Sequence, residues 1–135
     1  RFGCFEYNAS GDGLARIAND FVREGVPTMI PASNPSSVDI IEFYDQRDPL
    51  ATGVIENAIR YWGRAVANLI SIFNPEAIVL GGGLFGPAVR FIPEVKAEAG
   101  RWAQPIAFNK CELLPSKLGN DALLYGAAKL LLDES

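Results

Sequence analysis

The stretch NPEAIVLGGG, residues 74–83, decides the fold class of this chain. Its segment 77–80 is wholly apolar and carries two β-branched residues, which is typical of a parallel-sheet strand that is buried on both faces. Three glycines follow at once, and Gly86-Pro87 begins a predicted helix that runs from about residue 87 to 102. The order strand, glycine turn, helix predicts an α/β fold.

The three glycines, Gly81, Gly82 and Gly83, are the first candidate binding site. Without a Cβ atom they let a nucleotide approach the backbone, and amides at the start of the next helix can hydrogen-bond an anion or a ribose. Ligands of open α/β sheets favour the carboxyl ends of strands, where these glycines lie. The alternative is a tight turn that needs positive φ. The spacing fits neither a P-loop nor a G-x-G-x-x-G fingerprint.

Upstream of this stretch, residues 49–73 predict one long amphipathic helix. Pro49 suits a first helical turn, and Asn74-Pro75 ends the helix. Its polar side carries little basic excess, so we expect a core helix rather than a membrane-surface helix. The apolar positions follow the i, i+3, i+4 pattern: Ala51, Val54, Ile55, Ala58, Ile59, Trp62, Ala65, Val66, Leu69, Ile70 and Phe73.

The first 45 residues predict helices and one loop. Residues 4–25 are expected to be helical with a break at 9–13, where Ser10 or Asp12 would cap the second helix. Residues 26–36 contain three prolines and predict a loop, while 37–45 fit a short helix or a strand. The apolar face of the second helix consists of Leu14, Ile17, Ala18, Phe21 and Val22.

Downstream, a second strand is predicted from 106 to 114 and a last helix from about 121 to 132. Cys111 is expected to be a small core residue in that strand. Asn120 or Asp121 would cap the last helix, or would meet a ligand near the same sheet edge. The face expected to point to the core consists of Leu123, Leu124, Ala127, Leu130 and Leu131.

Composition excludes several classes of function. The 135 residues fit one domain or a piece of a larger one, and the net charge of −4 disfavours a nucleic-acid surface. The absence of His excludes a Ser-His-Asp triad within the chain, and two cysteines cannot build a four-Cys zinc site. No secretory signal or membrane-spanning run is visible, so a reducing cytoplasm is the expected location.

A thiol and a carboxylate near the start form the second candidate site. Cys4 lies two residues before Glu6, and together they could hold a metal or orient a polar ligand. The alternative is a buried cysteine beside an exposed glutamate.

Taken in order, these segments resemble the ROK family of bacterial sugar kinases and sugar-responsive repressors. The matching segments are RFGCFE at 1–6, ASG at 9–11, NPEAIVLGGG at 74–83, LGNDA at 118–122 and GAA at 126–128. The resemblance implies a ribonuclease H-like, actin-type ATPase fold, with a helix-rich part and few strands in this chain. It covers the back half of the family pattern C-x-C-G-x-x-G-C-x-E, so we expect these 135 residues to be a C-terminal portion.

The resemblance also implies roles for single residues. Cys4 matches a ligand of a structural zinc whose other ligands would lie before Arg1, so no zinc is expected with this chain alone. Glu6 matches the carboxylate that accepts hydrogen bonds from sugar hydroxyls. Gly81, Gly82 and Gly83 match the adenosine-side glycines, and Gly11 with Asp12 lies where the family approaches the nucleotide.

The implied activity is transfer of the γ-phosphoryl of ATP to a hexose hydroxyl with Mg²⁺, as in a glucokinase or an N-acylhexosamine kinase. The catalytic base and the phosphate loop would lie outside this chain, which alone is therefore expected to be inactive. The alternative is the sugar-sensing domain of a ROK repressor. An unpaired sheet edge and an uncovered core face also predict self-association.

Overall fold

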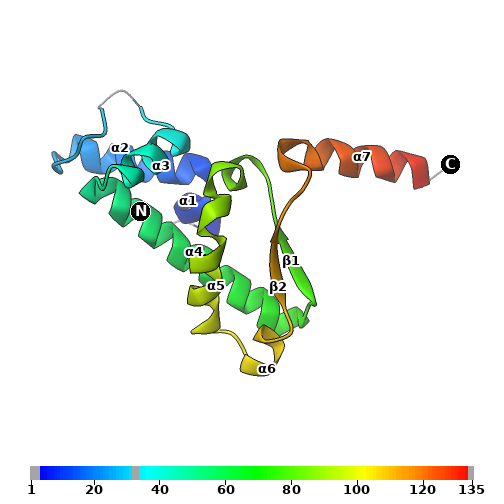
Figure 1. Ribbon diagram of the computed structural model, residues 1–135. Helices are drawn as coiled ribbons and strands as arrows, with labels where there is room; N and C mark the ends of the chain where they lie inside the picture. Colours follow the sequence, from blue (N-terminus) through cyan, green and yellow to red (C-terminus); the bar gives the residue numbers. More distant parts are fainter. Residues whose placement is uncertain (1–3, 32–33, 134–135) are drawn as a thin grey trace.

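The computed structural model describes residues 4–31 and 34–133, and it consists mainly of helices around one long central helix (Figure 1). The helices α1–α3 are followed by α4, after which two strands alternate with short helices. The elements are α1 Phe5–Ala9, α2 Gly11–Arg23, α3 Ser37–Asp45, α4 Pro49–Phe73, β1 Ala77–Leu80, η1 Gly83–Phe85, η2 Pro87–Phe91, α5 Ile92–Gly100, α6 Pro105–Phe108, β2 Glu112–Pro115, η3 Gly119–Asp121 and α7 Ala122–Asp133, where η marks a 3₁₀ turn.

Helix α4 has the bounds that the sequence predicts, because residues at both ends fix them. The Asp48 carboxylate accepts a hydrogen bond from the amide of Ala51 at 2.9 Å, and Pro49 occupies the first turn. At the other end Asn74 is left-handed, with φ of 46°, and Pro75 cannot continue the helix. Helix α4 is the centre of the core, as predicted. Its buried apolar side chains are Leu50, Ala51, Val54, Ile55, Ala58, Trp62, Val66, Ala67 and Ile70.

The helices α1, α2 and α3 pack against α4, with α1 beside its middle (Figure 1). Ser10 separates α1 from α2 and caps α2, since its hydroxyl accepts the amide of Gly13 at 3.0 Å. Residues 37–45 form a helix rather than a strand, and a reciprocal capping box between Ser36 and Asp39 begins it.

The fully buried carboxylate of Asp48 joins the loop before α3 to the start of α4. It accepts hydrogen bonds from the hydroxyl of Thr28 at 2.9 Å and from the amide of Met29 at 2.6 Å, in addition to Ala51. Burial alone would raise the pKa of Asp48, but these hydrogen bonds outweigh it and hold the pKa below its ordinary value.

In the second half of the chain, α5 packs against the middle of α4, and a small sheet follows (Figure 1). Strands β1 and β2 are parallel, with Ala77 opposite Glu112 and Leu80 opposite Pro115. Helices α4 and α5 approach closely at Gly63, where a Cβ atom would lie 2.6 Å from Cβ of Glu98.

Two expectations about the strands are wrong. Strand β1 is not buried on both faces: Ile78 and Leu80 pack against the core, but Val79 is 62% exposed because the described residues leave the second face of the sheet uncovered. Residues 106–108 are helical, since Gln104 accepts the amide of Ala107 at 2.6 Å and begins α6, so β2 starts only at Glu112. Cys111 is a buried core residue, as predicted.

The expected core face of α7 is also wrong. Leu124, Leu130 and Leu131 are 70%, 69% and 74% exposed, and Ala127 is exposed as well, whereas the side chain of Leu123 lies outside what the structure describes. Helix α7 projects away from the rest of the molecule (Figure 1), so its apolar residues do not reach the core around α4. The turn η3 directly precedes α7. Among the described helices, none is long and apolar enough to cross a membrane.

Candidate functional site

Cys4 and Glu6 lie at the start of helix α1. Cys4 is the N-cap residue and Glu6 is in the first turn, and both side chains are exposed. The backbone carbonyl of Cys4 accepts hydrogen bonds from the amide of Tyr7 at 3.1 Å and from the side-chain amide of Asn8 at 3.3 Å. The Glu6 carboxylate is therefore accessible to a ligand, and Cys4 is an exposed free thiol rather than a buried one.

A close backbone contact fixes α1 relative to α2. A Cβ atom on Gly13 would lie 2.7 Å from the carbonyl oxygen of Glu6 and would also overlap the carbonyl oxygen of Tyr7. Only a glycine lets α2 begin this close to the backbone that carries Glu6. Gly11 lies against Ser37, with 3.0 Å from its would-be Cβ to the hydroxyl oxygen, and Asp12 is exposed in the first turn of α2.

The three glycines follow β1 at the carboxyl end of the strand, and all three are exposed. Gly82 has φ of 89°, and a Cβ atom built there would meet nothing within 4 Å. Gly81 lies beside Ser116, whose amide donates to the carbonyl of Leu80 at 2.7 Å. The positive φ of Gly82 agrees with a tight turn that requires glycine. The open space at Gly82 also agrees with a turn that a nucleotide can approach.

The segment after the glycines is not an α-helix start, which corrects the predicted helix at 87–102. The 3₁₀ turns η1 and η2 come first, and α5 begins only at Ile92. The sequence Gly86-Pro87 explains the delay in part, since neither residue favours an α-helix interior. The amides nearest to the glycines therefore belong to η1.

Trp62 of α4 connects the two candidate regions. Its indole N–H donates to the carbonyl oxygen of Ala9, at the end of α1, at 2.8 Å. Its ring packs on Phe85 of η1, just after the glycines, with the ring centroids 5.2 Å apart. One buried side chain thus holds the end of the helix that carries Glu6 and the turn that follows Gly83.

Sequence reasoning placed Trp62 only in the apolar pattern of α4 and missed this connecting role. The available signal was chemical: a buried tryptophan keeps an N–H donor that needs a partner. Nothing in the sequence named Ala9 as that partner, because 53 residues separate the two along the chain.

Cys4 has no further metal ligands in the described part of the chain. Across residues 4–31 and 34–133, no three His, Cys, Asp or Glu side chains lie close enough together to hold a metal ion. Glu6 and Cys4 therefore do not form a metal centre with other described residues.

Comparison with known proteins decides the family. The model of the ROK family matches residues 1–134. The chain belongs to the ROK family.

Curated ROK relatives include kinases and repressors. The chain is 31% identical over 134 residues to a glucokinase of Halalkalibacterium halodurans, a match that covers 96% of this chain and 41% of the relative. It is 27% identical to a xylose repressor of Bacillus spizizenii, over 97% of this chain and 32% of the repressor. The chain spans about two-fifths of the length of the glucokinases that it matches.

A solved ROK structure supports the fold. A glucokinase from Streptomyces griseus, in complex with glucose and AMPPNP, superposes with a TM-score of 0.76 at 27% identity, over 96% of this chain and 45% of that chain. This ROK chain therefore has the actin-like ATPase fold, as predicted, and its described residues are helix-rich with two parallel strands.

Proposed function

We infer that this chain is the C-terminal part of an ATP-dependent hexose kinase, of the glucokinase or N-acylhexosamine kinase type. The observation that carries the proposal is the joint placement of its two candidate regions. Trp62 holds the end of α1, which exposes the Glu6 carboxylate, and the turn after the exposed glycines 81–83. The likeness to glucokinases, one of them solved with glucose and AMPPNP, supports a sugar and an ATP-like nucleotide as ligands.

Glu6 is the proposed sugar-binding residue. Its carboxylate is an acceptor on a helix whose position is fixed by the Gly13 contact, so little rearrangement is needed to receive sugar hydroxyls. Hydrogen bonds to an ionised carboxylate are stronger than neutral ones, which suits selection among hydroxyl patterns.

Gly81, Gly82 and Gly83 are the proposed nucleotide-binding residues on the adenosine side. The open space at Gly82 allows a flat base or a ribose to approach the backbone without meeting a side chain. Gly11 and Asp12 are proposed to lie near the nucleotide as well. Asp12 brings a negative charge, so it would contact the ribose rather than the phosphates.

The described residues do not fit a bound Mg²⁺ or Zn²⁺, since no three candidate ligands come together in them. No step of the reaction is therefore assigned to a metal on this chain. We place the catalytic base and the phosphate loop outside these 135 residues, in the part of the protein that corresponds to the unmatched length of the glucokinases. The chain alone is then inactive as a kinase.

The second candidate is the sugar-sensing domain of a ROK repressor. It is favoured by the xylose repressor match, which covers 97% of this chain, as fully as the glucokinase match. Both candidates use Glu6 for the sugar, but only the kinase requires the nucleotide at the glycines.

The test is an ADP-release assay on the full-length protein with a panel of hexoses and N-acylhexosamines. A kinase gives ADP release that depends on one of the sugars. Glu6→Gln should raise the KM for that sugar by about 5- to 150-fold, the equivalent of about 1–3 kcal/mol for buried hydroxyl partners left unpaired.

Glu42→Gln is the matched control, because Glu42 is an exposed glutamate on α3 outside the proposed site. Sugar binding by calorimetry without ADP release would contradict the kinase proposal and favour the repressor. A KM and turnover unchanged by Glu6→Gln would contradict the role of Glu6 in either case.

A further inference from the structure

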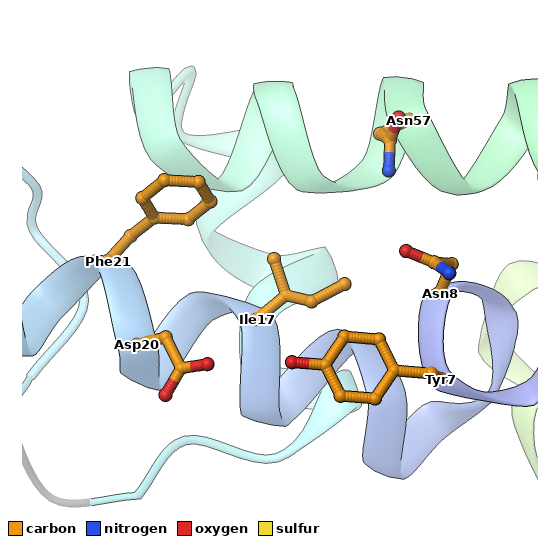
Figure 2. Close-up of a pocket in the computed structure, with 6 residues that line it drawn as sticks. All are labelled: Tyr7, Asn8, Ile17, Asp20, Phe21 and Asn57. Atoms are coloured by element: carbon orange, nitrogen blue, oxygen red, sulfur yellow. The ribbon is translucent and has the colours of Figure 1, made fainter. Parts of the chain in front are cut away.

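A recess lies between α1, α2 and α4, and neither Glu6 nor the glycines 81–83 line it. Its cavity volume is about 200 Å³, and its lining residues are Tyr7, Asn8, Ile17, Asp20, Phe21 and Asn57. Figure 2 shows the Asp20 carboxylate and the Tyr7 hydroxyl directed into the same space, with the amides of Asn8 and Asn57 on the side toward α4.

The recess continues into a second hollow with an apolar lining. The second hollow, of about 350 Å³, shares Ile17, Phe21 and Asn57 with the first, so the two are contiguous. It extends past Val26 at the end of α2 and along the first turns of α4, over Leu50, Gly53 and Val54. The whole groove therefore has a polar end and an apolar end.

The polar end lacks internal partners. Within residues 4–31 and 34–133, no hydrogen bond or ion pair engages the Asp20 carboxylate, the Tyr7 hydroxyl or the Asn57 amide. The side-chain amide of Asn8 donates to the carbonyl of Cys4, which leaves its oxygen available as an acceptor. These groups are half-buried and can be satisfied by a ligand as well as by water.

The charge of the groove selects a cation. Asp20 is the one acidic side chain among the residues that line the two hollows, and neither Lys nor Arg lines them. Arg16 does not line the groove; its guanidinium lies over the Tyr7 ring, 4.3 Å from the ring centroid. An ammonium carries three N–H donors and no acceptor, which matches the carboxylate of Asp20, the phenol oxygen of Tyr7 and the amide oxygen of Asn8.

We propose that this groove is a binding site for a small organic amine with an aliphatic or aromatic tail. The ammonium lies against Asp20 and Tyr7, and the tail crosses Phe21 to the apolar hollow beside Gly53. Ligand pockets in proteins commonly combine an apolar lining with a few convergent polar groups, as this groove does. Neither Glu6 nor the glycines 81–83 line the groove, so the proposal does not depend on the kinase assignment.

The experiment uses the full-length protein and three probes with the same tail, namely hexylamine, hexanol and hexanoate. Calorimetry is performed in phosphate buffer at pH 7, because Tris is itself an amine. Hexylamine should bind at least about tenfold more tightly than hexanol, since a charge-assisted hydrogen bond replaces a neutral one, and hexanoate should bind weakest. Equal binding of hexylamine and hexanol, tighter binding of hexanoate, or no saturable binding of hexylamine would overturn the proposal.

Two variants test the two ends of the groove. Asp20→Asn keeps the shape and removes the charge, and it should weaken hexylamine by about tenfold while hexanol is unchanged; Glu42→Gln is its control for a charge change elsewhere. Gly53→Leu should fill the apolar hollow and abolish binding of hexylamine. A Cβ atom at Gly53 meets nothing within 4 Å, so Gly53→Ala is the matched variant that should keep both the fold and the binding.

The thermal midpoint of each variant shows whether the fold is retained. The midpoints of both Gly53 variants should be at or above that of the parent protein, because glycine is a poor residue in a helix interior. Retained hexylamine binding in Gly53→Leu, or unchanged binding in Asp20→Asn, would show that the amine binds elsewhere and would reject the site.

Discussion

Helices α4 and α7 have similar sequence patterns and opposite environments. Both carry apolar residues at helical spacing, yet Ile55 and Ile70 of α4 are fully buried, whereas Leu124 and Leu130 of α7 are 70% and 69% exposed. Helix α4 is surrounded by α1, α2, α3 and α5, while α7 projects from the end of β2 (Figure 1). An apolar face thus indicates that a helix is adapted for burial, but not that the rest of the same chain buries it.

The largest expected effect tests the α4 side of this comparison. Trp62→Ala removes a 3%-exposed side chain together with its hydrogen bond to Ala9, and it should lower the free energy of unfolding by about 3–5 kcal/mol. Urea denaturation followed by far-UV circular dichroism measures the change. Trp102→Ala is the control, since Trp102 is 58% exposed. An equal loss of unfolding free energy in the two variants would contradict the central role of α4 in the core.

The next largest effect is expected at Gly13, where α2 contacts the backbone of α1. In Gly13→Ala the new methyl group meets backbone carbonyl oxygens of α1, which cannot rotate away as a flexible side chain can. We expect a loss of about 2–3 kcal/mol in unfolding free energy, together with weaker sugar binding in the full-length protein. Gly53→Ala, which has open space, should instead gain about 0.5–1 kcal/mol. Destabilisation of both variants to the same extent would contradict the close contact at Gly13.

A smaller effect is expected at Asp48, where α4 begins. Asp48→Ala removes the cap of α4 and the acceptor of Thr28 and Met29, and should cost about 1–2 kcal/mol at pH 7. Asp39→Ala, an exposed capping residue of α3, should cost less.

The effect of Asp48 should also depend on pH. Because the pKa of Asp48 is lowered in the folded state, its contribution is fully present above its unfolded pKa of about 4 and is lost as the pH falls through the folded pKa. The difference between parent and Asp48→Ala in urea denaturation should therefore narrow below pH 4. A constant difference from pH 7 to pH 2 would exclude ionised Asp48 as the stabilising species.

The smallest expected effect tests α7. In the 135-residue chain, Leu130→Ala should change the unfolding free energy by less than about 0.5 kcal/mol, as for other exposed positions. Leu130→Glu should reduce the predicted self-association, measured by light scattering, because it places charge on an exposed apolar face. A loss of about 2 kcal/mol or more would contradict the exposure of Leu130 and remove the contrast with α4.

The sequence was most informative where local signals and burial agree. The bounds of α4 could be predicted because Asp48-Pro49 and Asn74-Pro75 mark its ends by local backbone chemistry. The start of α2, for which Ser10 was one of two candidate caps, and the glycine turn after β1 were predictable for the same reason.

The failures share a physical cause, which is dependence on distant partners. Residues 106–108 are apolar enough for a strand, but the parallel pairing with β1 begins only at Glu112, and Gln104 caps a helical turn instead. The exposure of Val79 depends on which element covers the second face of the sheet. The sequence of a four-residue strand carries no information about that element. For the candidate site, the roles of the glycines and of Glu6 stay predictions from the sequence, whereas the connection through Trp62 became visible only in the tertiary fold.

Because Trp62 and Trp102 differ in exposure, the intrinsic fluorescence of this protein can report on the surroundings of Trp62. Trp62 is nearly inaccessible and touches both the Ala9 carbonyl and Phe85, while Trp102 is open to solvent. A soluble quencher such as acrylamide would quench the fluorescence of Trp102 much more than that of Trp62. The remaining fluorescence would then register, without any label, whether α1 and the glycine turn shift relative to one another when a ligand arrives.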